Sequence, residues 1–116
     1  MLEWTPERIE ALAVQKAEEH NLPSVYLFVE TMRRESMGFT AEQSFVPDPK
    51  GPNGREDSWG VCQIHLPGKN ITREQALDPE FCLEWSAQMF EDGEARQWTE
   101  YRKLTAPKPH PYGLPE

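Results

Sequence analysis

The sequence lacks any apolar run as long as the ~20 residues that a membrane-spanning helix needs. Its first 20 residues alternate charged with apolar positions, whereas a signal peptide has a continuous apolar segment. We therefore expect no membrane insertion and no secretory signal, so that the protein is made in the cytoplasm.

Basic residues are also few. Lys and Arg number 12 against 20 Asp and Glu, which gives a formal net charge of -8 at pH 7. A field of that sign repels phosphate backbones and anionic lipids. Nucleic acid and membrane surfaces are therefore not expected as main partners.

Cysteine and histidine are scarce, and neither follows the spacing of a metal site. The three histidines lie far apart in the sequence, and the only two cysteines are Cys62 and Cys82. Cys62 lies in the apolar run VCQI and Cys82 follows Phe81, so we expect small buried side chains rather than a disulfide. We predict no metal and no cofactor.

The sequence does contain enough apolar material for one folded domain. Of its 116 residues 37% are hydrophobic and 10% aromatic, which is too many for a disordered chain and enough for a single core. The apolar spacing is helical almost throughout, and no segment alternates as a strand does. We expect a mainly α domain over residues 1–105 and an extended, proline-rich tail over 106–116.

Capping residues mark the expected helices. Thr5 and Pro6 start a helix over residues 5–19, and Pro23 opens a second that ends near Gly38. A capping box at residues 72–75 predicts a short helix, residues 78–93 a longer one, and a last helix holds Trp98 and Tyr101. Between the second and third helices, residues 39–58 are rich in Pro, Gly, Asn and Asp. A loop this long in a small domain is more often functional than idle.

Glu35 is the most informative single residue. It comes three residues after Met32 and seven after Phe28, so on a helix it shares their apolar face. A carboxyl in apolar surroundings has a raised pKa, as a general acid near neutral pH requires. The competing interpretation is an ordinary helix-end acid paired with Arg33 or Arg34.

The motifs around Glu35 resemble the soluble lytic transglycosylase family of the lysozyme-like superfamily. In that family a Glu-Ser pair ends a helix, a serine follows nine residues later, and a Gly-Leu-Met-Gln run comes next. The resemblance covers roughly residues 9–92 and depends on the order of several short motifs. Here these are Glu35-Ser36, Ser44, Gly60-Val61-Cys62-Gln63, Leu22-Pro23 before the helix, and Leu77-Asp78-Pro79-Glu80 after the loop.

The resemblance implies a lysozyme-like catalytic domain that cleaves the β-1,4 bond between N-acetylmuramic acid and N-acetylglucosamine in peptidoglycan. Glu35 takes the position of the catalytic acid and base, Ser44 that of a serine near the substrate, and Gln63 that of a glutamine lining the cleft. Ser44 as a turn residue and Gln63 as an exposed amide remain alternatives.

Residues 47–57 depart from the family pattern as an insertion. They bring Glu56 and Asp57 beside the cleft motif, and either carboxylate is a candidate to activate water as a second catalytic group. Without one, the 6-hydroxyl of the sugar attacks and an anhydro product forms, which is the route that the resemblance favours. The family's later Asn-Ala-Gly segment is missing, and Val61 and Cys62 replace the family's Leu and Met.

Aromatic and histidine side chains near these motifs are candidates for sugar contacts, since aromatic faces stack on sugar rings. We expect Trp59 at the rim of the cleft, and His65 either as a hydrogen-bonding group or as a surface histidine. Trp98 and Tyr101 fit the core or the substrate site, with the core favoured, and Trp85 fits the core.

Two other functions stay open at this stage: a chitin-directed hydrolase, and a non-catalytic module that binds cell walls. A small, acidic wall enzyme without a signal or a binding domain suggests a monomeric phage lysis or virion protein, such as an endolysin, or a piece of a larger protein. The expected partner is the glycan strand of peptidoglycan.

Overall fold

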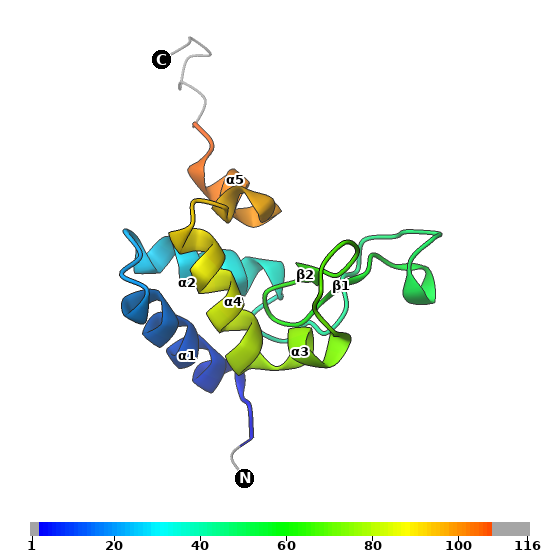
Figure 1. Ribbon diagram of the computed structural model, residues 1–116, viewed down its shortest axis with the longest axis horizontal. Coiled ribbons are helices and arrows are strands. Elements are labelled where there is room, and N and C mark those ends of the chain that lie inside the picture. Colours follow the sequence, from blue (N-terminus) through cyan, green and yellow to red (C-terminus); the bar gives the residue numbers. More distant parts are fainter. Residues whose placement is uncertain (1–2, 108–116) are drawn as a thin grey trace.

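The computed structural model describes residues 3–107, which form a mostly helical domain (Figure 1). The prediction of a mainly α fold is confirmed. Residues 108–116 of the predicted tail lie outside the described residues. Within the described range no helix has the length and hydropathy of a membrane span. The elements in chain order are α1 Pro6–Glu19, α2 Val25–Glu35, η1 Pro52–Gly54, β1 Ser58–Trp59, β2 Ile64–His65, α3 Arg73–Leu77, α4 Pro79–Glu91, η2 Ala95–Gln97 and α5 Thr99–Thr105.

The helices begin at the capping residues that the sequence indicates. The Thr5 side chain accepts a hydrogen bond from the Arg8 amide at 3.2 Å, with Pro6 at the first helical position of α1. The capping box at Thr72 and Gln75 opens α3 as predicted. Asp78 then ends α3 and caps α4, so these two helices follow each other without a loop.

Helix α2 is shorter than predicted at both ends. It starts after Ser24, whose hydroxyl caps it, and it ends at Glu35 rather than near Gly38. The Ser36 hydroxyl donates to the Met32 carbonyl at 2.7 Å and accepts from the Phe39 amide at 2.9 Å, which closes the helix in a buried turn. Glu35 is therefore the last residue of α2.

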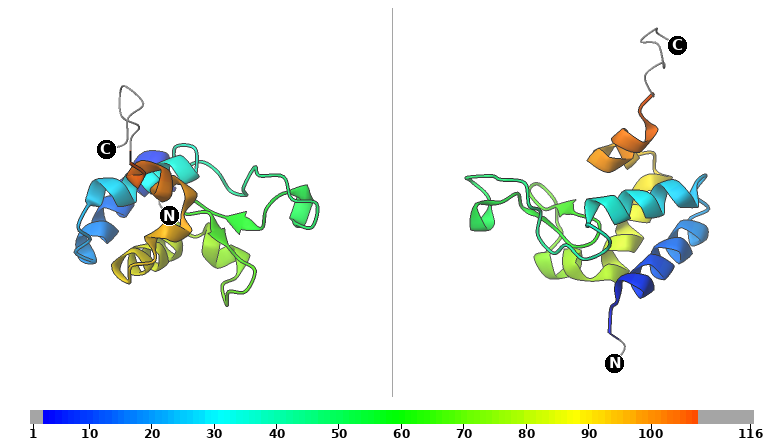
Figure 2. Two further views of the ribbon diagram at one scale, coloured as in Figure 1. Left: turned by 90° about the horizontal axis from the view of Figure 1, so that it is seen from above. Right: turned by 180° about the vertical axis from the view of Figure 1, so that it is seen from behind.

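The core lies between α1, α2 and α4, which pack against one another (Figures 1 and 2). Phe28 and Met32 of α2 are fully buried, and Phe28 meets Phe90 of α4 edge to face at 5.0 Å. Burial of each such large side chain contributes about 1.5 to 3 kcal/mol. Trp98 is also buried, and its indole N–H donates to the Cys62 carbonyl at 2.7 Å. The favoured core interpretation of Trp98 is confirmed.

A short β-hairpin occupies the segment where no strand was predicted. Strands β1 and β2 are antiparallel, with Ser58 opposite His65 and Trp59 opposite Ile64. Strands of two residues are too short to show alternation in a sequence. Gly60 starts the hairpin turn with φ +80, and a Cβ there would come within 1.8 Å of the Ala76 carbonyl oxygen, so only glycine fits.

The predicted insertion forms a lobe that projects beside the hairpin (Figure 2). It is anchored by Gln43, which is buried although it is polar. The Gln43 amide nitrogen donates to the Pro52 carbonyl at 2.7 Å, and its oxygen accepts from Arg55 at 3.0 Å. An isolated bridge between Pro47 and Arg55 adds to this anchoring.

A histidine joins α1 to α4 at the other side of the domain. His20 has one ring nitrogen 2.7 Å from a carboxylate oxygen of Glu84 and the other 2.8 Å from one of Glu91. Burial alone would lower the pKa of His20, but the hydrogen bonds to Glu91 and Glu84 outweigh it and raise the pKa above its ordinary value. Both contacts are favourable only with the doubly protonated ring.

Candidate active site

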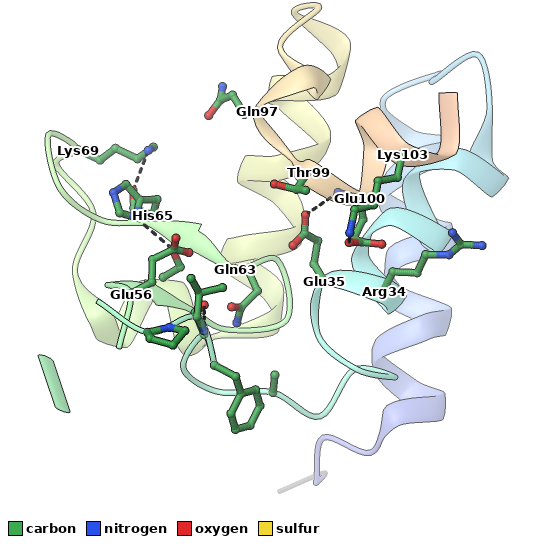
Figure 3. Close-up of a pocket in the computed structure, with 16 residues that line it drawn as sticks. Arg34, Glu35, Glu56, Gln63, His65, Lys69, Gln97, Thr99, Glu100 and Lys103 are labelled. Atoms are coloured by element: carbon green, nitrogen blue, oxygen red, sulfur yellow. Dashed lines mark hydrogen bonds and ion pairs between the residues drawn. The ribbon is translucent and has the colours of Figure 1, made fainter. Parts of the chain in front are cut away.

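Glu35 lies on the wall of an open cleft of about 850 Å³ (Figure 3). One wall comes from the end of α2 and from the segment η2–α5, and the other from the loop, the lobe and the hairpin. The first wall is lined by Arg34, Glu35, Gln97, Thr99, Glu100 and Lys103. The second is lined by Ala41, Ser44, Phe45, Val46, Pro47, Glu56, Ser58, Gln63, His65 and Lys69.

Glu35 has the properties expected of a general acid. Its side chain is half-buried, and one carboxylate oxygen accepts a hydrogen bond from the Glu100 amide of α5 at 3.2 Å. Burial raises the pKa of Glu35, the hydrogen bond from Glu100 partly offsets this, and the negative charges of Glu100 and Glu56 raise it further. The protonated form of Glu35 is therefore retained at a higher pH than in an exposed glutamate.

The competing interpretation of Glu35 as an ion-paired helix end does not fit the arginines. Arg33 pairs with Glu10 and with Glu30, and Arg34 pairs with Glu30 at 3.2 Å. Within residues 3–107 Glu35 takes part in no ion pair. The two arginines before Glu35 thus pair with other glutamates, and the Glu35 carboxyl remains directed at the cleft (Figure 3).

Of the two candidate second carboxylates, the structure brings Glu56 into the cleft and leaves Asp57 outside it. Glu56 lies on the wall opposite Glu35 and accepts a hydrogen bond from the Ser58 hydroxyl at 2.9 Å. The Asp57 carboxylate instead accepts from the Trp59 indole N–H at 2.6 Å. Glu56 and Asp57 are the two residues before β1. Side chains of successive residues along a strand point to opposite faces, and the same alternation explains why only one of the two carboxylates enters the cleft.

Ser44, Gln63 and His65 all line the cleft. Their contacts with a substrate stay a prediction. Ser44 is buried, and its hydroxyl accepts from the Val46 amide at 3.1 Å, so it has the turn role as well. The Gln63 amide donates to the Gly60 carbonyl at 2.9 Å. His65 is exposed, with its Nδ1 3.1 Å from the Ser58 hydroxyl.

The prediction that Trp59 lies at the rim of the cleft is wrong. Trp59 is only 7% exposed and does not line the cleft, because the indole is covered by the Arg73 guanidinium at 4.1 Å from the ring centroid. Tyr101 packs edge to face against Phe90 at 5.3 Å and against the core, as the favoured interpretation expects, and it does not line the cleft. It borders a separate cavity of about 380 Å³ between the start of α2 and α5.

Several cleft residues escaped the sequence analysis. Thr99, Glu100 and Lys103 reach the cleft only because α5 folds back onto the end of α2, and no local motif indicates this. Phe45 did carry a signal, since an aromatic residue that opens a polar loop has no helix face to bury it. It is 62% exposed, and the Arg55 guanidinium lies 5.2 Å from its ring centroid.

The cysteines lie behind the cleft as free thiols. Cys62 and Cys82 are fully buried, as predicted, with their sulfur atoms 3.3 Å apart. Burial raises the pKa of Cys62 well above its ordinary value, which disfavours the thiolate form. In the part of the chain that the structure describes, no group of three potential metal ligands comes together.

Comparison of the chain with models of protein families, with curated proteins and with solved structures finds no match. The roles of the cleft residues are therefore inferred from geometry and chemistry, and the resemblance to lytic transglycosylases stays a prediction.

Proposed function

We propose that this protein cleaves the β-1,4 bond between N-acetylmuramic acid and N-acetylglucosamine in peptidoglycan, with Glu35 as the general acid. The observation that carries the proposal is a half-buried carboxyl of raised pKa on the wall of an open cleft. Protonation of the leaving oxygen is the step that every glycosidic cleavage of this kind requires, and Glu35 is suited to it.

The other cleft residues support a sugar substrate. Sugar hydroxyls and acetamido groups need hydrogen-bonding side chains, and the cleft offers the amides of Gln63 and Gln97 and the hydroxyl of Thr99. The exposed ring of Phe45 adds an aromatic face of the kind that sugar rings stack on. Arg34, Lys69 and Lys103 also line the cleft, which offsets its three glutamates in an otherwise acidic protein.

A lysozyme-like fold is part of the proposal. A catalytic glutamate at the end of a helix, facing a small β-hairpin across the substrate cleft, is the arrangement that such a fold entails. Here α2 ends at Glu35 and the β1–β2 hairpin forms part of the opposite wall.

Two routes lead from the protonated bond to products. On the transglycosylase route, which the motif resemblance favours, Glu35 donates its proton to the leaving oxygen and then, as a carboxylate, takes the proton of the sugar's 6-hydroxyl. That oxygen closes on C1 and gives a 1,6-anhydro end. On the hydrolytic route a second carboxylate activates water, and the presence of Glu56 in the cleft supports it as the second candidate.

Delivery to the wall is a further element of the proposal. An acidic enzyme gains no general electrostatic attraction to an anionic cell wall, so we propose that a phage particle or a lysis system brings it there.

Digestion of defined glycans tests the proposed substrate. Purified peptidoglycan and chitin oligomers are incubated with the protein, and released fragments are measured by mass spectrometry. We expect muropeptides from peptidoglycan and slower or no cleavage of chitin. If chitin oligomers were cleaved faster than peptidoglycan, chitin would be the substrate. Binding to cell walls without any cleavage would indicate the non-catalytic module instead.

A further inference from the structure

Three side chains in the cleft form a continuous hydrogen-bonded chain from His65 through Ser58 to Glu56. Strand pairing sets it up, because Ser58 and His65 are directly opposite in the β1–β2 hairpin and project on the same side. The Ser58 hydroxyl lies 2.9 Å from Glu56 Oε1 and 3.1 Å from His65 Nδ1. Glu56 and His65 both line the Glu35 cleft.

The chemistry of these groups fixes which group donates and which accepts in each of the two hydrogen bonds. A hydroxyl has a single proton, and an ionised carboxylate only accepts, so Ser58 donates to Glu56. Its lone pair then accepts from His65, which places a proton on Nδ1. Ser58 is only 3% exposed, so water does not compete for its hydroxyl. The pair Ser58 and His65 thus holds Glu56 in one orientation.

The backbone of Glu56 is held as well. Its amide donates to the Val46 carbonyl at 2.8 Å, and its own carbonyl accepts from the buried Gln43 amide at 3.3 Å. Within the described residues, Oε2 of Glu56 accepts no hydrogen bond, whereas Oε1 is occupied by Ser58. A fixed carboxylate with one open oxygen, across a cleft from an acid of raised pKa, is suited to activate a water molecule.

We propose that Glu56, oriented by Ser58 and His65, is the general base of a hydrolytic reaction, so that this cleft releases water-cleaved rather than anhydro fragments. The inference rests on the proposed function and reverses the route that the motif resemblance favours. Ser58 and His65 are positioning residues, while Glu35 and Glu56 are the catalytic pair.

The step balances with water as the only co-reactant. Glu56 takes one proton from water while the water oxygen bonds to C1 of the sugar. The bond from C1 to the bridging oxygen breaks, and Glu35 gives its proton to that oxygen. Glu35 ends as a carboxylate and Glu56 as a carboxylic acid, and exchange of protons with solvent restores both. Attack from the side opposite the leaving group inverts the anomeric centre.

The products of the unmodified protein give the first test. Digestion of peptidoglycan in water enriched in ¹⁸O is expected to yield fragments that carry one ¹⁸O at the new reducing end, initially as the α anomer. Unlabelled anhydro fragments, lighter by one water, would overturn this inference and leave the proposed function intact. No cleavage at all would overturn both.

Substitutions in the hydrogen-bonded chain test the role of each of its residues. Glu56→Gln is expected to lower hydrolysis by about 10² to 10⁴-fold, the usual contribution of a general base. Ser58→Ala should lower it by about 10 to 100-fold through misplacement of Glu56, whereas Ser58→Thr keeps a hydroxyl and most of the rate. Glu42→Gln is the matched control, because Glu42 is exposed and does not line the cleft.

Azide separates a loss of base from a loss of structure, since azide attacks C1 without a base. Added azide should restore cleavage by Glu56→Ala and by Ser58→Ala, and the product should be a glycosyl azide. Failure of azide to restore either variant would overturn the assigned roles. Hydrolysis that survives Glu56→Gln but is lost in Asp57→Asn would assign the base to Asp57 instead and overturn the inference.

Discussion

Replacement of Trp59 by alanine should destabilise the fold strongly and is the sharpest test of where this side chain lies. Trp59 is 7% exposed, donates a hydrogen bond to Asp57 and is covered by Arg73. Truncation of a buried tryptophan to alanine typically costs about 3 to 5 kcal/mol. In a domain of this size about 1 kcal/mol corresponds to about 4 °C, so we expect the melting temperature to fall by about 12 to 20 °C.

Thermal unfolding followed by circular dichroism measures this fall, with Trp4→Ala as the matched control. Trp4 is 42% exposed, and a substitution at such a position usually changes stability by no more than about 0.5 kcal/mol. If Trp59→Ala lowered the melting temperature no more than Trp4→Ala, Trp59 would not be a core residue. The original expectation of a sugar-stacking side chain at the rim of the cleft would then be restored.

Three further substitutions have defined outcomes. His20→Gln should lower the stability most below about pH 6.5 and progressively less as the pH rises through the raised pKa of His20, because the ring then loses the proton that it shares with the two carboxylates. Melting curves of the variant and of the unmodified protein across pH measure this loss. A loss that does not depend on pH would contradict the prediction. Glu35→Gln should become more stable than the unmodified protein as the pH rises from about 4.5, because burial disfavours only the ionised carboxyl. If the difference in melting temperature between this variant and the unmodified protein were the same at pH 4 and at pH 8, it would speak against a desolvated Glu35. Ser44→Ala should lower the rate of glycan cleavage by about 10 to 100-fold if its hydroxyl orients groups in the cleft, and an unchanged rate would leave Ser44 with its turn role alone.

The helices could be predicted from the sequence because their signals are local. Caps at Thr5, Thr72 and Asp78 satisfy the first backbone amides of the following helix, and this requires nothing from distant residues. The end of α2 was misplaced by about three residues because Ser36 closes the helix through its own hydroxyl, an interaction that competes with helix continuation.

The site was predicted only as far as local motifs reach. Glu35 was found because apolar spacing placed it on a buried helix face. The Glu100 amide that bonds to it belongs to α5, and the position of α5 depends on tertiary packing. The choice between Glu56 and Asp57 likewise depended on the hairpin, whose strands are too short to be recognised in a sequence.

Trp59 shows that the neighbours of a residue in the sequence do not fix where its side chain points. It was assigned to the cleft because it adjoins the Gly60–Gln63 run in sequence. In a strand successive side chains point to opposite faces, so Ser58 faces the cleft while Trp59 faces the core. Adjacency to a functional motif therefore predicted the right segment and the wrong residue.

The rate of peptidoglycan cleavage by Glu35→Gln, measured as released muropeptides, tests the central claim most directly. The amide keeps the shape of the side chain but has no proton to donate to the leaving oxygen, and Glu42→Gln serves as a control for the same chemical change at an exposed site. With both variants folded, we expect Glu35→Gln to lose at least about 100-fold in rate and Glu42→Gln to retain the full rate. Full activity of Glu35→Gln would contradict the assignment of Glu35 as the catalytic acid.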